Sequence, residues 1–512
     1  MKIISRTARS LKNSITAIGF YAINLCLQFF SRKIFLEYLG TEILGLNTTA
    51  MNLLQFLNLA ELGISAAVGF TLYKPIYERN INTINEIVTL QGYLYRRIAY
   101  FIIVGALILM YFFPLIFAEI SIPLWYAYAS FGVLLTSALL GYFINYKQIV
   151  LTANQQDYKV LYSFKSVMLV KIIFQMIAVR FWDNGYIWWL IFEVMFAFIG
   201  SYALDKMTRK TFPFLSTSRI PFKELKIKYP TFTIKIKQLF FHKIGGFAIG
   251  QAAPLIVYGY TSLTVVALYG NYLIVVNGII GLMNAMFNSM SAGIGNLVAE
   301  GDDTRIISVF NELFSVRFFI ISSLCFTTFN LMPSFISLWI GSQYVMPTST
   351  SILIITTMYI SLSRYSVDAF INAYGLFQDI WSPIAEATIN ITTSIFLGYY
   401  YGLNGVLMGG ILSLLLVIKI WKPYFLFKST IKGYFKKYVF IYFKHLSIAF
   451  IIAFLSWKIL FFISPDPNIN IGNLILAGIL NLIVFGGLLA ISLIVTNCGL
   501  KQFIRRFVRI EF

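Results

Sequence analysis

The sequence predicts an all-α, polytopic integral membrane protein with about 14 transmembrane helices, arranged as two six-helix lobes and a C-terminal helix pair. Hydrophobic residues make up 59% of the 512-residue chain and charged residues only 12%, whereas soluble proteins contain about 25% charged residues. Several apolar segments exceed the roughly 20 residues that cross a bilayer core. The links between them are alternately rich in and nearly free of Lys and Arg, which is the topology signal of multi-pass proteins.

Six apolar segments form the first predicted lobe. The basic N-terminus precedes the first segment as in a signal peptide, but that segment is too long and no small-residue cleavage site follows. We therefore expect it to be a retained helix. The expected helices cover residues 13–36, 43–72, 92–113, 122–146, 161–181 and 186–204.

A polar stretch over residues 205–243, which contains ten Lys or Arg residues, separates the two predicted lobes. We expect it to lie on the cytoplasmic membrane surface; the alternative is a docking site for lipid headgroups. Further helices are expected over residues 245–260, 263–298, 313–340, 346–374, 383–401, 403–421, 446–463 and 471–495. The predicted domains are an N-terminal lobe (1–207), a basic cytoplasmic linker (208–243), a C-terminal lobe (244–422), and a region with a basic link, the last two helices and a basic tail (423–512).

Composition argues against several classes of function. The net charge of +20 is concentrated in the predicted cytoplasmic links, so it indicates topology and contact with membrane lipids rather than nucleic-acid binding. Cys26, Cys325 and Cys498 are scattered, and we interpret them as small core residues. His242 and His445 are too far apart in the sequence to indicate a metal site. Without a phosphate-binding glycine loop or a nucleophile motif, we expect no catalytic residues, no cofactor and no enzyme activity.

The first predicted helix carries polar residues that are costly in lipid. Asn24, Gln28 and Arg32 are spaced four residues apart and therefore share one helix face, with Lys33 beside them. In one interpretation, the two bases extend to the outer interface. In the other, Arg32 points into a central cavity and binds an anion, because a guanidinium matches phosphate oxygens. Two bases at an outer helix end break the charge pattern and favour the second interpretation.

The second predicted helix carries Asn52, Gln55, Asn58 and Glu61, each three residues apart. This spacing produces a polar stripe that drifts slowly around the helix. The stripe indicates either hydrogen bonding between packed helices or the wall of a polar cavity. In the cavity interpretation, Asn52 and Gln55 contact substrate, whereas Glu61 binds a proton or sodium ion or pairs with a nearby base.

Two further positions are candidates for function. Arg364 and Asp368 are spaced as an i,i+4 ion pair, which is either structural or a gate that breaks when the conformation changes. Lys171 lies near the middle of a predicted helix, where it would supply a second base to a cavity.

The N-terminal region resembles bacterial polysaccharide flippases. Residues 6–13 read RTARSLKN, residues 28–47 read QFFSRKIFLEYLGTEILGLN, residues 52–64 read NLLQFLNLAELGI, and residues 70–76 read FTLYKPI. These proteins belong to the multidrug/oligosaccharidyl-lipid/polysaccharide exporter superfamily, which also contains MATE-type drug exporters and the peptidoglycan lipid flippase. The helix count and the basic linker extend the resemblance, in pattern only, over the rest of the chain.

The resemblance implies a MATE-like fold with two lobes around a cationic cavity, in which Arg32 best matches the expected arginine of the first helix. It also implies that the protein moves an undecaprenyl-diphosphate-linked oligosaccharide from the cytoplasmic to the outer leaflet of the bacterial inner membrane, by alternating access. Such transport serves O-antigen, capsule or exopolysaccharide synthesis. A polysaccharide polymerase and chain-length machinery are further candidate partners. Both termini are expected in the cytoplasm.

Two alternatives remain at this point. A MATE-type, cation-coupled multidrug antiporter would use acidic residues such as Glu61 and Asp368, but Arg32 and Lys171 disfavour binding of organic cations. A membrane-embedded glycan polymerase or ligase would need a sizeable outer loop. Every predicted outer loop is short, which disfavours an enzyme of this kind.

Overall fold

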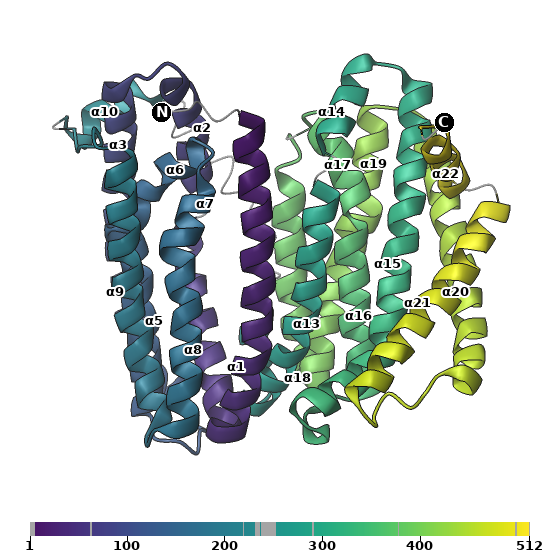
Figure 1. Cartoon of the computed structure of the whole chain (residues 1–512), viewed down its shortest axis with the longest axis horizontal. Helices are drawn as coiled ribbons and strands as arrows, with labels where there is room; N and C mark the ends of the chain where they lie inside the picture. The colour runs from purple at the N-terminus through teal and green to yellow at the C-terminus, as the bar shows by residue number, and fades with distance from the viewer. Residues whose placement is uncertain are drawn as a thin grey trace. The chain divides into compact units, whose positions relative to one another are not determined.

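The chain folds into helices that form two compact units. The structure, a computed structural model, describes residues 6–61, 64–218, 220–230, 236, 252–288, 291–376, 378–496 and 499–510. Unit 1 comprises Met1–Ala267 and unit 2 comprises Leu268–Phe512. The division falls inside a helix, α13 (Leu263–Asn288). Long helices dominate each unit (Figure 1). The domain boundaries expected from the sequence stay predictions.

The larger apolar cluster described in unit 1 contains Leu46, Ile87 and Phe131, which are fully buried. Ala178, Phe192 and Phe196 form a smaller, separate cluster. The long helices cross the unit, and short turns at their ends reverse the chain. The described elements are α1 (Arg6–Leu57), η1 (Asn58–Glu61), α2 (Ile64–Tyr77), α3 (Ile81–Tyr111), α4 (Phe113–Ile116), α5 (Trp125–Phe143), η2 (Asn145–Gln148), α6 (Ile149–Ala153), α7 (Asp157–Val160), η3 (Leu161–Lys165), α8 (Ser166–Phe181), α9 (Gly185–Thr211), α10 (Phe222–Lys228), α12 (Ala253–Tyr260) and the start of α13.

The described residues of unit 2 include one apolar cluster around Phe310 and Phe427 and another around Phe485 and Leu489. The second cluster joins α15 to the C-terminal helix pair α20 and α21. The described elements are the rest of α13, α14 (Ser291–Glu300), α15 (Asp303–Ile340), η5 (Ser342–Tyr344), α16 (Thr348–Ser363), α17 (Tyr365–Ala373), α18 (Trp381–Leu414), η6 (Leu415–Trp421), α19 (Lys422–Ser429), α20 (Tyr434–Ile463), α21 (Ile471–Val495) and α22 (Gly499–Ile510).

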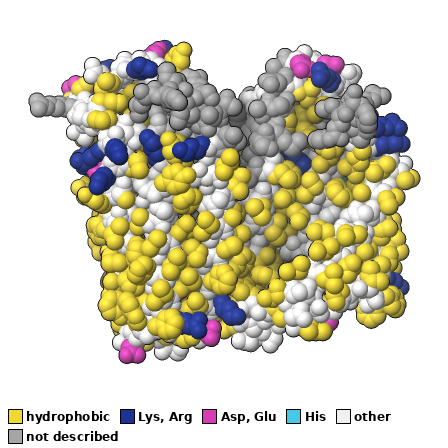
Figure 2. Space-filling model, viewed as in Figure 1, with side chains coloured by type: hydrophobic (Ala, Val, Ile, Leu, Met, Phe, Trp, Pro, Cys, Tyr) yellow, Lys and Arg dark blue, Asp and Glu magenta, His cyan; other side chains and the backbone are white. Residues whose placement is uncertain are grey.

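On the face shown in Figure 2, the described surface of each unit is mainly apolar over the middle of the helices. Residues such as Phe101, Leu107 and Phe454 are more than half exposed, which is costly in water but favourable in lipid. Within the described residues, nine helices are long and apolar enough to cross a membrane. The chain is therefore a multi-pass, all-helical membrane protein, as the sequence predicts; the number of about 14 crossings stays a prediction.

The first two predicted helices run together as α1, which bends at Gly40 (φ 80°, ψ 176°). Glycine adopts this positive φ without a steric penalty, so it permits the sharp turn. The second predicted helix does not continue to residue 72 as expected. It ends at Leu57, passes into the 3₁₀ turn η1, and α2 begins only at Ile64. The polar stripe from Asn52 to Glu61 is therefore divided between two geometries.

The third predicted helix begins earlier than residue 92. In the structure α3 starts at Ile81, where the Asn80 side chain accepts a hydrogen bond from the Thr83 amide at 3.0 Å. This is a typical N-cap interaction, and it stabilises the helix start. The sequence places this boundary too late because polar residues such as Glu86 and Gln91 are typical of a link, whereas here they are buried within the helix.

Contacts bring several basic links to the same end of unit 1. The Asn13 amide donates to the carbonyl of Gln155 at 3.1 Å, and the Lys159 ammonium donates to the Thr211 hydroxyl at 3.0 Å. The alternation of basic and base-free links predicts this common location.

The first half of the basic linker packs on the start of α3. Asn85 donates to the carbonyl of Phe214 at 3.1 Å. The Glu86 carboxylate pairs with Lys228 at 2.7 Å and accepts from the Tyr229 hydroxyl at 2.6 Å. Burial, followed by the hydrogen bond to Glu86, raises the pKa of Tyr229 to about 12. The described part of this linker, residues 212–218 and 220–229, is thus anchored to unit 1, and its place on the membrane surface stays a prediction. Residues 219, 231–235 and 237–243 of the predicted linker lie outside the described residues.

A tight helical hairpin organises unit 2. The backbone of α18 reverses at Gly402 (φ 53°, ψ −132°), and its second half returns along the first. A Cβ at Gly405 would lie 1.9 Å from the carbonyl oxygen of Leu397, and one at Gly409 would lie 2.4 Å from the amide nitrogen of Ser394. Glycine is required at both positions, because only small residues let two helix backbones approach so closely.

Candidate functional site

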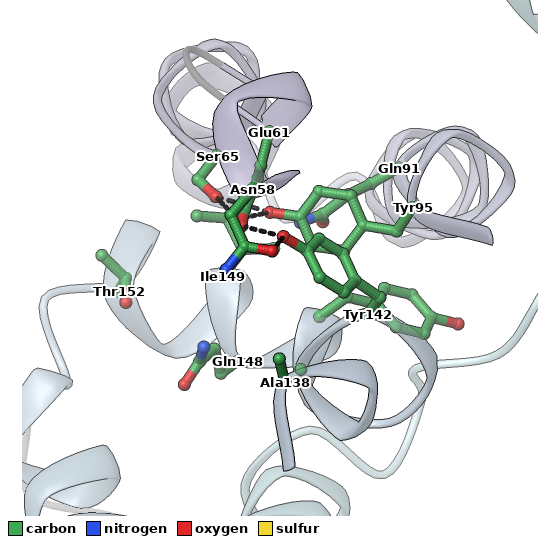
Figure 3. Close-up of a pocket in the computed structure, with 12 residues that line it drawn as sticks. Asn58, Glu61, Ser65, Gln91, Tyr95, Ala138, Tyr142, Gln148, Ile149 and Thr152 are labelled. Atoms are coloured by element: carbon green, nitrogen blue, oxygen red, sulfur yellow. Dashed lines mark hydrogen bonds between the residues drawn. The ribbon is translucent and has the colours of Figure 1, made fainter. Parts of the chain in front are cut away.

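A polar cavity of about 410 Å³ lies inside unit 1, where η1, α2, α3 and α5 meet (Figure 3). Glu61 sits at the end of η1 and points toward tyrosines of the two neighbouring helices. The residues that line the cavity are Asn58, Glu61, Ser65, Gln91, Tyr95, Ala138, Gly141, Tyr142, Tyr146, Gln148, Ile149 and Thr152.

Hydroxyl groups surround the Glu61 carboxylate. Oε1 accepts from the Tyr95 hydroxyl at 2.7 Å and from the Ser65 hydroxyl at 3.2 Å. Oε2 lies 3.0 Å from the Tyr142 hydroxyl, which is also 3.0 Å from Oδ1 of Asn58. Ser65 and Tyr95 are 2.5 Å apart, which completes a connected network. Such a network holds the carboxylate in one orientation.

Among the described residues that line this cavity there is no base, so neutral hydroxyl donors offset the charge of Glu61 there. Oε1 of Gln91 is buried and makes no hydrogen bond within the described structure. A carboxylate together with amide and hydroxyl oxygens is the donor set that hard cations prefer, and a proton on the carboxylate would also remove the unbalanced charge. The cavity is therefore chemically suited to a proton or a small cation.

Arg32, the predicted anion ligand, lies half-buried on α1 and donates to the carbonyl of Ala267 at 2.9 Å. The second half of α1 meets the same segment, because a Cβ at Gly45 would lie 2.1 Å from the carbonyl oxygen of Leu263. The guanidinium is thus directed toward the start of α13. Of the residues predicted with it, Asn24 is half-buried, whereas Gln28 and Lys33 are exposed.

Asn52 and Gln55, the other predicted substrate contacts, lie on the last turns of α1. Asn52 is buried and its Nδ2 makes no hydrogen bond within the described structure, whereas Gln55 is half-buried. Neither lines the cavity around Glu61. The structure therefore joins Glu61 and Asn58 at one cavity and separates them from the other half of the predicted stripe.

Lys171 forms an ion pair with Glu193 across helices α8 and α9. Its ammonium lies 2.7 Å from Oε1 and 2.8 Å from Oε2, and Gln175 donates to the same carboxylate at 3.1 Å. Both charged side chains are mostly buried. The charge of Lys171 is therefore neutralised within unit 1, which reduces what it contributes to binding an anion.

Arg364 and Asp368 form the ion pair that their spacing predicts, with Nε and Oδ2 2.7 Å apart. Lys422, the first residue of α19, also contacts Asp368 at 3.2 Å. Glu386 on α18 lies within electrostatic range of all three and is 3% exposed. Its Oε1 makes no hydrogen bond within the described residues. Two bases and two acids thus form one charge-balanced cluster in unit 2.

Several of these partners were not identified from the sequence. Tyr95 and Tyr142 gave no signal, because tyrosines in apolar segments usually belong to the core or the membrane interface. The position of Glu193, in contrast, does indicate its partner. Glu193 and Lys171 lie eleven residues on either side of Trp182, which is in the turn that joins α8 and α9. Residues equidistant from the turn of a helical hairpin lie at the same height, so this pair could have been predicted.

Two solved structures share the fold. The lipid II flippase MurJ in an inward closed conformation aligns with a TM-score of 0.63 over 94% of this chain and 100% of that chain, at 15% identity. An inward-facing multidrug resistance MATE family transporter of the MOP superfamily aligns with a TM-score of 0.59 over 82% of this chain and 99% of that chain, at 11% identity. No family model and no curated protein matches the sequence. The chain therefore has the MATE-like fold predicted from its sequence.

Proposed function

We propose that the protein is a flippase that moves a polyprenyl-diphosphate-linked oligosaccharide from the cytoplasmic to the outer leaflet of the bacterial inner membrane. The observation that carries this proposal is the fold shared with a lipid flippase over nearly the whole chain. The N-terminal sequence pattern around Arg32 supports the same class of substrate. Fold alone does not define a substrate, so the proposal depends on the residues.

A substrate with a diphosphate head would explain why the protein has a positively charged side chain, Arg32, in a predicted membrane-spanning helix. A diphosphate head with its sugar hydroxyls would lose its hydration in hydrocarbon, at a prohibitive cost. Alternating access gives the head a hydrated route while the polyprenyl tail remains in lipid. An interior-negative potential helps to move an anion outward, by about 2.3 kcal/mol per charge for each 100 mV.

The residue roles in this proposal follow the geometry. Arg32 supplies the cation for a phosphate oxygen, exchanging its hydrogen bond to the Ala267 carbonyl for one to the substrate. Gln28 and Asn24 lie about one and two turns away, respectively, on the same face of α1. Lys171 takes a lesser part, because Glu193 neutralises it.

The test is export of surface polysaccharide in cells that carry Arg32→Ala as their only copy. We expect export to fall to background, and Arg32→Lys to restore part of it, because lysine keeps the charge but not the fork geometry. Lys458→Ala, which removes an exposed base near the end of α20, is the matched control. Undiminished export by Arg32→Ala, with normal protein levels, would contradict the proposed role.

The proposal includes a cytoplasmic location of both termini and surface polysaccharide enzymes, such as a polymerase, as downstream partners. The basic links that meet at one end of unit 1 support this orientation. Fusions of a reporter to residue 512 and to an outer link, such as residues 183–184, test this orientation. A reporter that is active only in the periplasm, when fused to residue 512, would contradict it.

A second candidate is a cation-coupled multidrug antiporter. The observation in its favour is the cavity around Glu61, whose lining, as far as the structure describes it, holds one carboxylate among hydroxyl and amide oxygens and no base. Drug susceptibility of cells lacking the gene separates the two candidates. Sensitisation to several cationic drugs, with normal surface polysaccharide, would favour the antiporter.

A further inference from the structure

The last described helix, α22, separates its residue types cleanly around its axis. It carries Lys501, Arg505, Arg506 and Arg509 and no acidic residue. At 100° per residue, these bases fall within one arc, and the apolar residues Leu500, Phe503, Ile504, Phe507, Val508 and Ile510 fall within the opposite arc. This strong segregation with low overall hydrophobicity is typical of helices that lie in a membrane interface rather than crossing it.

Packing fixes the beginning of α22 on unit 2. A Cβ at Gly499 would lie 2.3 Å from the carbonyl oxygen of Asn311 on α15, so the two backbones are in close contact. Leu500 is 6% exposed and belongs to the apolar cluster that contains Phe485 and Leu489. The helix is therefore held in a set position at the end of the unit where α14, α17 and α19 also lie (Figure 1).

Beyond this anchor, the described side chains of Gln502, Ile504 and Arg505 are exposed, whereas those of Lys501 and Phe503 are half-buried. Ile504 is 41% exposed and Arg505 is exposed. Among the described residues, neither Lys501 nor Arg505 forms an ion pair. Lys444 adds another base nearby, because its ammonium donates to the carbonyl of Thr496, just before α22. An apolar edge beside unneutralised bases matches acyl chains beneath anionic headgroups.

We propose that α22 is a binding site for anionic phospholipids, with Lys501 and Arg505 on the headgroup phosphates and Ile504 among the upper acyl carbons. The site is independent of the transported substrate, and only the assignment to the cytoplasmic leaflet depends on the proposed orientation. The length of α22, 12 residues, suits a helix lying in the interface and is too short to cross the bilayer.

The test measures lipids retained by the purified full-length protein, by native mass spectrometry from micelles containing equal amounts of phosphatidylglycerol and phosphatidylcholine. We expect the wild type to retain phosphatidylglycerol preferentially. Lys501→Gln with Arg505→Gln should weaken that binding about fivefold for each base removed, without changing phosphatidylcholine binding. The matched control is Arg180→Gln with Lys458→Gln, two bases outside α22, which should behave as the wild type.

Two further variants keep the result interpretable. Lys501→Arg with Arg505→Lys preserves the charges and should preserve the preference. Ile504→Ser keeps every base but removes the apolar edge, and it should weaken retention of both lipids severalfold. Equal retention of phosphatidylglycerol by the wild type and the double glutamine variant would overturn the proposal. The proposal would also be overturned if an added acidic peptide abolished the preference for phosphatidylglycerol while the glutamine substitutions left that preference unchanged.

Discussion

Two charged sites, Glu61 with its neutral neighbours in unit 1 and the ion-pair cluster around Asp368 in unit 2, differ in how their charge is balanced. In unit 1, the Glu61 carboxylate is surrounded by the hydroxyls of Tyr95, Tyr142 and Ser65, and the described lining of its cavity contains no base. In unit 2, Asp368 bridges Arg364 and Lys422 at 2.7 and 3.2 Å. The first cluster carries an unbalanced charge, whereas the second, with Glu386, is balanced internally.

This difference indicates what each cluster is suited to do. A carboxylate held only by neutral donors changes its electrostatic energy strongly when a proton or cation arrives, because nothing else offsets its charge. A balanced cluster responds little to one ion, but it loses much when any member is removed. We therefore expect the unit 1 cluster to sense ions and the unit 2 cluster to stabilise a conformation. A gate formed by Arg364 and Asp368, one of the two interpretations of their spacing, would be one form of the latter.

The largest expected effect is at Asp368. Asp368→Asn leaves Arg364 and Lys422 without their shared carboxylate and should destabilise the protein by about 3 kcal/mol, the lower end for buried pairs because the side chains are partly exposed. Thermal unfolding of the purified protein measures this. Arg209→Gln is the matched control, since it breaks an i,i+4 pair whose base is 72% exposed and should cost under about 1 kcal/mol. Equal losses in both variants would remove the distinction between the clusters.

Glu61→Gln should change transport rather than stability. The amide keeps the size and the hydrogen-bonding capacity of the side chain but carries no charge. We expect the variant to fold normally and to transport at a rate that no longer depends on the proton or sodium gradient. Transport by the purified protein in vesicles, with and without each gradient, measures this. An unchanged gradient dependence would exclude Glu61 as the coupling site.

Tyr142→Phe should have a smaller effect, because it removes one donor and leaves the carboxylate. The lost hydrogen bond to a charged group is worth about 1.5 kcal/mol. We expect a lower melting temperature together with a weaker response to the gradient. Tyr202→Phe, at a 70% exposed tyrosine, is the control and should leave both quantities unchanged. Loss of stability with a full gradient response would mean that Tyr142 only packs.

The smallest expected loss of stability is at Asp302, an exposed N-cap residue of a helix in unit 2. Its carboxylate accepts from the hydroxyl of Thr304 at 2.6 Å and from the amides of Thr304 and Arg305. These hydrogen bonds, with that to the Thr304 hydroxyl strongest, lower the pKa of Asp302 below its usual value. The cap therefore stabilises α15 at neutral pH, and its contribution is lost as the pH falls through the lowered pKa.

Asp302→Ala should lower the melting temperature slightly at pH 7 and not at all in strong acid, where the wild-type cap is also protonated. Asp302→Asn should retain most of the wild-type stability, because asparagine caps helices as well as aspartate does. A melting temperature of Asp302→Ala below that of Asp368→Asn would reverse the expected order.

The sequence predicts side-chain pairs within one helix but not pairs between different helices. The pair of Arg364 and Asp368 follows from the helical repeat alone, and it is present. The continuous helix expected over residues 43–72 is wrong, since the polar residues that drew attention to it also lie where the chain breaks into a 3₁₀ turn. Hydrophobicity marks which segments enter the membrane but is insensitive to a short break within one.

By itself, the sequence determined that the chain spans a membrane many times as helices, because a bilayer forces every backbone polar group to be satisfied within the segment. It also determined which residues are too polar for lipid. Only the tertiary structure decided which partners these residues have: hydroxyls for Glu61, a carboxylate for Lys171, and the Ala267 carbonyl for Arg32. Such partners come from different helices, and helix packing depends on side-chain shape at every contact, which one-dimensional patterns do not encode.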